Sequence, residues 1–97
     1  MASKKENILF VDDEVKLLQG LRRYLRPMRN QWHMTFLSNG KDSLAFLEDN
    51  AVDVVVSDMR MPAMTGSELL SQISRLYPDI VRIMLSGYTE NREILNS

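Results

Sequence analysis

The sequence predicts an α/β fold in which helices cover both faces of a parallel β-sheet. Short apolar runs alternate with stretches of helical periodicity along the 97 residues. The runs are mostly apolar rather than strictly alternating, as expected for strands that are buried on both faces of a parallel sheet. Strand–helix alternation with short connections further indicates βαβ units with right-handed crossovers.

Four short runs are predicted as strands. They are residues 8–11, 33–37, 52–56 and 80–85. The third run is rich in β-branched residues, which favours a strand, and the second is the weakest of the four. Polar residues follow the first, third and fourth runs directly, and this places polar groups where those strands end.

Helical periodicity fills the intervals between these runs. Residues 14–26 repeat apolar side chains at steps of three and four until Pro27 closes the pattern. Residues 41–49 and 66–76 are predicted as two further helices. A fourth helix is expected to start near Glu90, and the sequence stops inside it at Ser97.

Composition and charge restrict the classes of function. The chain is 44% hydrophobic and 26% charged, which is typical of one globular domain over residues 1–97. Its net charge of −1 does not indicate binding to nucleic acid or to an anionic membrane. It has no cysteine and one histidine, so disulfides and zinc sites rich in Cys or His are excluded. No apolar run reaches about 18 residues, and no signal peptide precedes the first strand, so we expect a cytoplasmic protein.

A basic stretch lies at the end of the first predicted helix. It contains Arg22, Arg23, Arg26 and Arg29. Because the net charge is balanced, a solvated helix face is favoured over a nucleic-acid site.

Acidic residues gather at the predicted carboxyl ends of the strands. Asp12 and Asp13 follow the first strand, Asp58 follows the third, and Ser86 follows the fourth. Open α/β sheets bind ligands beyond these ends, where the strand order reverses. Three carboxylates there would repel one another, and Mg²⁺, which prefers oxygen ligands, would relieve that repulsion and orient a phosphoryl group toward a carboxylate nucleophile.

Each of these residues also has a structural interpretation. Asp13 could cap the first helix, since Asp is a favoured N-cap residue and capping does not exclude metal binding. Asp58 taken alone could be a turn-forming acid, and Ser86 a polar strand end. The presence of all four residues together favours the functional interpretation.

The motifs resemble those of bacterial two-component receiver domains over essentially the whole chain. They are FVDDE at residues 10–14, VSDMRMP at 56–62, GSELL at 66–70 and LSGY at 85–88. The resemblance implies a flavodoxin-like fold, here with strand order 2-1-3-4, and phosphotransfer from a sensor histidine kinase to Asp58. It also implies that Asp13, Asp58 and the backbone carbonyl of Arg60 hold Mg²⁺, with Asp12 acting mainly through metal-bound water. Ser86 would bind the phosphoryl group.

The sequence departs from the family at its end. Receivers have a fifth strand that ends in a phosphate-binding lysine, followed by a fifth helix, and no such segment precedes Ser97. We therefore expect a fragment of a longer receiver, with weakened phosphorylation and a C-terminal effector domain in the parent protein. The motifs give only a weak analogy to cyclic-di-GMP phosphodiesterase or HD-type effectors. An uncovered fourth strand would invite self-association or exchange of an element with a second copy.

The leading hypothesis is a self-phosphorylating switch, and we do not expect such a switch to be an enzyme with an independent substrate. Two other functions are alternatives to it. The first is a phosphorylation-independent interaction module of the same fold. The second is a haloacid-dehalogenase-like phosphatase, but that family requires Asp-x-Asp after its first strand, and Asp12-Asp13-Glu14 fits this requirement poorly.

Overall fold

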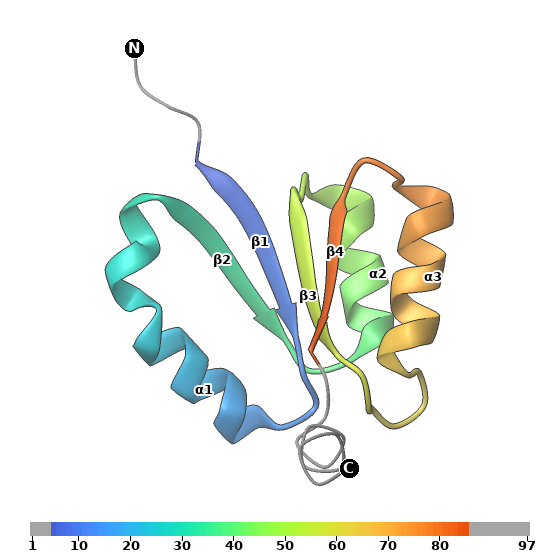
Figure 1. Ribbon diagram of the computed structural model, residues 1–97, viewed down its shortest axis with the longest axis horizontal. Coiled ribbons are helices and arrows are strands. Elements are labelled where there is room, and N and C mark those ends of the chain that lie inside the picture. The colour runs from blue at the N-terminus through green and yellow to red at the C-terminus, as the bar shows by residue number, and fades with distance from the viewer. Residues whose placement is uncertain (1–4, 86–97) are drawn as a thin grey trace, which may run out of the picture.

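The computed structural model describes residues 5–85 (Figure 1). In chain order its elements are β1 (Glu6–Val11), α1 (Val15–Tyr24), a 3-10 helix η1 (Arg26–Asn30), β2 (Trp32–Leu37), α2 (Gly40–Asp49), β3 (Val54–Asp58), α3 (Gly66–Leu76) and β4 (Val81–Leu85). The strands form one parallel sheet in the order β2-β1-β3-β4. The predicted α/β class and strand order are confirmed; the helix expected near Glu90 lies outside the described residues.

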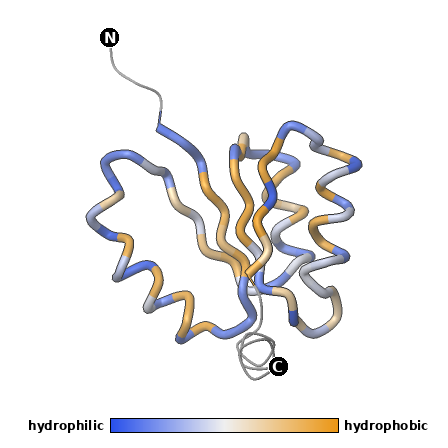
Figure 2. Tube along the Cα trace, viewed as in Figure 1, coloured by the Kyte–Doolittle hydropathy of each residue, from blue (hydrophilic) through white to orange (hydrophobic). Residues whose placement is uncertain are grey.

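Helices cover the two faces of the sheet unequally. One core joins Leu9, Val11 and Val55 to α2 and α3, whereas Ile8 and Phe10, on the opposite face, pack against α1. Figure 1 shows α2 and α3 together on one side of the sheet and α1 on the other. The strands form the hydrophobic centre of the trace, and the helices alternate between polar and apolar residues (Figure 2). This is the amphipathic pattern from which the helices were predicted.

The bounds of the third strand differ from the predicted ones, because hydrogen bonds between distant residues fix where the strand begins and ends. The third strand was predicted over residues 52–56, and this is wrong by two residues at each end, because β3 spans Val54–Asp58. Asp53 exchanges two bonds with Asn7 before the strand begins: its N–H donates to the Asn7 carbonyl at 2.8 Å, and its carboxylate accepts the Asn7 N–H at 2.8 Å. The pairing then continues until Asp58 lies opposite Leu85. Asp58 is therefore the last residue of the strand.

The first helix ends earlier than predicted. It was expected over residues 14–26, but α1 ends at Tyr24 and the chain continues as η1. Pro27 lies in the first turn of η1, where the N–H that proline lacks would have no helical partner. The proline thus closes one helix and begins a second, which the periodicity did not indicate. The helix predicted over 41–49 begins one residue earlier, at Gly40, and the helix over 66–76 is confirmed.

The fourth strand forms an edge of the described sheet. Within residues 5–85, β4 pairs only with β3. On one face of β4 the side chains are partly exposed to solvent: Val81 by 56%, Ile83 by 44% and Leu85 by 43%. The same side chains share a face with Val54 and Val56 of β3, on the side that α1 occupies. No helix among residues 5–85 has the length and apolar character needed to cross a membrane.

Candidate functional site

The first part of the site is the turn that leaves β1. The Asp12 N–H donates to the Leu37 carbonyl at 3.1 Å, which ties this turn to the end of β2. The Asp12 carboxylate accepts the Glu14 N–H at 2.9 Å and is 5% exposed. Asp12 is therefore held in one orientation by its own turn, in the manner of an Asx turn. Asp13, the next residue, is exposed.

The second part is the end of β3 and the loop that returns to α3. Asp58 is half-buried, and the loop closes when the Gly66 N–H donates to the Met59 carbonyl at 2.8 Å. A Cβ atom on Gly66 would lie 2.1 Å from the backbone oxygen of Asp58. Because two backbone segments meet there, the position accepts only glycine without a shift of the chain. The same loop holds Ala63 at a φ of 68°, in the left-handed region.

These two turns bring three carboxylates together. One carboxylate oxygen each from Asp12, Asp13 and Asp58 lies within 4.8 Å of the other two. Within residues 5–85, this is the only group of three or more acids, histidines or cysteines spaced for a metal ion. The pairing of β1 with β3, which sets Val11 opposite Ser57, brings the carboxyl ends of the two strands side by side.

Burial and repulsion act together on Asp12. Its burial raises the pKa of this carboxyl above the ordinary value of 3.8, and the negative charges of Asp58, Asp13 and Glu14 raise the pKa further. The hydrogen bond from the Glu14 N–H opposes this rise because it stabilises the charged form. The net pKa is raised, so the ionised cluster costs folding free energy at neutral pH.

The cluster fits a hard divalent cation. Mg²⁺ binds oxygen at about 2.1 Å, so two oxygens bound to the same ion lie about 3–4 Å apart. The carboxylate oxygens of the cluster lie up to 4.8 Å apart, which suits an ion bound directly by some carboxylates and through water by others. Such an ion would also remove the repulsion that raises the pKa of Asp12.

Asp12→Asn is expected to stabilise the metal-free protein by on the order of 1 kcal/mol at pH 7, because it removes a buried charge and keeps an oxygen for the Glu14 N–H. The raised pKa means that the folded state binds this proton more tightly than the unfolded state. Wild-type stability therefore falls as pH rises from the ordinary value near 3.8 through the raised pKa, and the advantage of the variant grows over that window.

Urea denaturation in EDTA at several pH values checks this expectation. Asp79→Asn, at an exposed acid away from the cluster, is the control and is expected to change stability by less than about 0.5 kcal/mol. An Asp12→Asn variant less stable than wild type at pH 7 would contradict the account.

The other predicted site residues have different outcomes. Arg60 is exposed, and it borders with Asp13 a cavity of about 330 Å³, so the structure brings it beside the cluster. Ser86 lies outside the described residues. The alternative that Asp13 caps the first helix is wrong: the N-cap is Glu14, which makes no side-chain capping bond, and it is Asp12 whose carboxylate accepts the Glu14 N–H.

Two supporting features were missed. The fully buried Ser57 hydroxyl donates to the Asp58 carbonyl at 2.9 Å, and a serine at a strand end gives no signal of that contact. The start of α3 is fixed by a capping box, in which Thr65 and Glu68 each accept a backbone N–H from the other. The sequence Thr-x-x-Glu before an apolar helix is a recognisable signature and could have been found.

Comparisons with known proteins bear on the family and the fold. The family description that matches is "Response regulator receiver domain", over residues 8–97. The hydrogenase transcriptional regulatory protein HoxA of Cupriavidus necator is 36% identical over 95 residues, which cover 98% of this chain and 19% of HoxA. The chain therefore spans about a fifth of the length of this relative.

Solved structures show the same fold. The signal receiver domain of an HD domain-containing protein from Pseudomonas fluorescens has a TM-score of 0.82 at 32% identity, covering 95% of this chain and 72% of that one. The response regulator TrrA of Thermotoga maritima, solved in complex with Mg²⁺-BeF, has a TM-score of 0.77 at 28% identity, covering 95% and 78% of the two chains.

Proposed function

Because the chain belongs to the response regulator receiver domain family, we propose that Asp58 accepts a phosphoryl group and that Asp12 and Asp13 hold Mg²⁺ beside it. The observation that carries this proposal is the convergence of the three carboxylates at the carboxyl ends of β1 and β3. Ligands of open α/β sheets bind at this place. Receiver domains are signalling domains that work with histidine kinases, so the proposed chemistry is a modification of the chain itself.

The proposed reaction transfers a phosphoryl group to a carboxylate. An oxygen of Asp58 attacks the phosphorus of a phosphohistidine, the new O–P bond forms as the P–N bond breaks, and the leaving imidazole takes up a proton. The product is an acyl phosphate, which water hydrolyses to inorganic phosphate and the free carboxylate. A bound Mg²⁺ would neutralise phosphoryl oxygens and draw them toward Asp58.

The residues around Asp58 have separate tasks in this proposal. Asp12 is buried and held by the Glu14 N–H, so it keeps a metal-binding orientation before any ion arrives. Asp13 is exposed and borders the cavity beside Arg60, which suits a ligand that meets the ion directly. We propose the Arg60 carbonyl as a further metal ligand and Ser86 as the hydroxyl that binds the phosphoryl group.

The partners of the whole protein follow from the relatives. A histidine kinase is the proposed phosphodonor, and an effector domain in the same polypeptide is the proposed target of the switch. HoxA carries a receiver-like region in a protein named as a transcriptional regulator. The likeness to a receiver from an HD domain-containing protein points to a different effector class. Determining the full parent sequence would distinguish these two effector classes.

Beryllofluoride, a phosphoryl mimic, separates this function from a phosphorylation-independent interaction module. With Mg²⁺ present, ¹⁹F NMR is expected to show protein-bound fluoride resonances that disappear in Asp58→Asn or after EDTA. The interaction module predicts no bound resonance under any of these conditions.

Self-association through the edge of β4 stays a prediction, supported by the exposed apolar side chains there. Sedimentation velocity that shows a strict monomer at high concentration would contradict it.

A further inference from the structure

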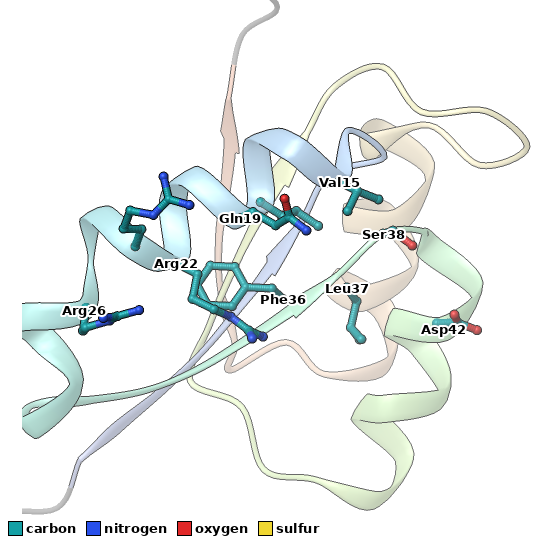
Figure 3. A pocket seen from close by; sticks show the side chains of 10 residues that line it. Val15, Gln19, Arg22, Arg26, Phe36, Leu37, Ser38 and Asp42 are labelled. Atoms are coloured by element: carbon teal, nitrogen blue, oxygen red, sulfur yellow. The ribbon is translucent and has the colours of Figure 1, made fainter.

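A basic groove lies beside α1, and none of its lining residues belongs to the three-carboxylate cluster. It is a cavity of about 670 Å³ between α1, β2 and the start of α2 (Figure 3). Its apolar lining comes from four side chains: Val15, Leu18, Phe36 and Leu37. A second cavity of about 340 Å³ continues it along η1 and shares Arg22, Arg26 and Phe36 with the first. The two cavities together are called the α1–β2 groove below.

Four exposed arginines line this groove. Arg22, Arg23 and Arg26 line the first cavity, and Arg29 lines the second. In Figure 3, Arg22 and Arg26 lie toward one end of the groove and Asp42 lies at the other end. No ion pair to any of the four is formed by a residue in the 5–85 range. In a chain of net charge −1, four guanidinium groups without a carboxylate partner among residues 5–85 give one groove a strong local positive charge.

The side chains that line the α1–β2 groove make a nucleic acid or a membrane a poor ligand for it. The Phe36 ring is stacked on Phe10, with centroids 4.9 Å apart and an angle of 9° between the planes. The Arg22 guanidinium covers the ring at 5.1 Å from its centroid. The Phe36 ring is thus already engaged by a second ring and by a guanidinium, which disfavours its use as a stacking platform for a nucleic-acid base. A flat membrane surface does not enter a concave groove either.

We propose that the α1–β2 groove binds an acidic, amphipathic peptide segment of a partner protein. The apolar side chains of the groove match the apolar side chains of such a segment, and the arginines match its carboxylates. Guanidinium groups bind carboxylates with good geometry, and an amphipathic helix in a hydrophobic groove is a recurring mode of peptide recognition. Neither Asp58 nor the other two carboxylates of the cluster line the groove, so its occupation is compatible with a phosphoryl group at Asp58.

The test uses a fluorescein-labelled helical peptide with leucines on one face and glutamates on the other. A matched peptide with lysines in place of the glutamates is the charge control. We expect the acidic peptide to bind, with an affinity that falls as salt is raised, and the basic peptide to bind at least about tenfold more weakly. Trp32, the only tryptophan of the chain, lines the second cavity and reports the event through its fluorescence.

Variants assign the binding to the groove. Arg26→Glu with Arg29→Glu, which spares the Arg22 contact with Phe36, is expected to weaken binding by about tenfold or more. Arg75→Glu, an exposed arginine at the end of α3, is the matched control and should change it by less than about twofold. Circular dichroism checks that the variants fold. Amide chemical shifts of the wild-type chain should move in α1, η1 and β2.

Four results would overturn the proposal. The first is equal binding of the two peptides, and the second is no binding of the acidic peptide at millimolar concentration. The third is undiminished binding by the double variant. The fourth is a DNA duplex that displaces the peptide completely at comparable concentration, which would assign the groove to nucleic acid.

Discussion

Asp58→Asn is expected to abolish phosphorylation of this chain by acetyl phosphate and Mg²⁺. The amide that replaces the carboxylate cannot form the acyl phosphate, whereas the fold should survive because Asp58 is only half-buried at the end of β3. Incorporation should fall by about two orders of magnitude or more, measured by intact-protein mass spectrometry.

Asp49→Asn is the matched control for this substitution. Asp49 is an exposed acid at the end of α2, away from the cluster, and incorporation should stay at the wild-type level. Equal phosphorylation of Asp58→Asn and wild type would remove Asp58 from the proposed mechanism.

Gly66→Ala is expected to destabilise the protein by about 3 kcal/mol. The added methyl group would lie 2.1 Å from the Asp58 oxygen and 2.9 Å from the Met59 Cα, and both are backbone atoms that cannot rotate away. The loop would have to move at the residue that carries the proposed nucleophile. Thermal unfolding and urea denaturation measure the loss.

Gly20→Ala is expected to have the opposite effect on the stability of the same chain. Gly20 lies within α1, and a Cβ atom there would meet nothing within 4 Å, so alanine should stabilise the helix by about 0.5–1 kcal/mol. If both substitutions had the same small effect, the close approach at Gly66 would not be a constraint on the fold.

Much of the fold follows from the sequence because apolar periodicity is a local property. The bounds of α3 were predicted correctly from its helical repeat, and the observed strand order is the one that the family resemblance implied. The extent of β3 was not, because it depends on bonds between Asp53 and Asn7, 46 positions apart. Such contacts are set by the register of the sheet and have no local signature.

The candidate site was predictable in its residues but not in its environment. Asp12, Asp13 and Asp58 were found because polar residues after buried strands converge in a parallel sheet. The burial of Asp12 and its bond to the Glu14 N–H could not be read from adjacent acids. The arginines of the α1–β2 groove were expected to form a solvated face. They are exposed, and only the packing of α1 beside β2 reveals the groove that they line.

The central claim is that the three carboxylates form a phosphoacceptor site centred on Asp58. The most direct measurement is peptide mass spectrometry of the chain after treatment with acetyl phosphate and Mg²⁺. The account predicts one phosphoryl group, on the peptide that contains Asp58, and none when EDTA is added. Phosphate on another residue, or metal-independent incorporation at Asp58, would contradict it.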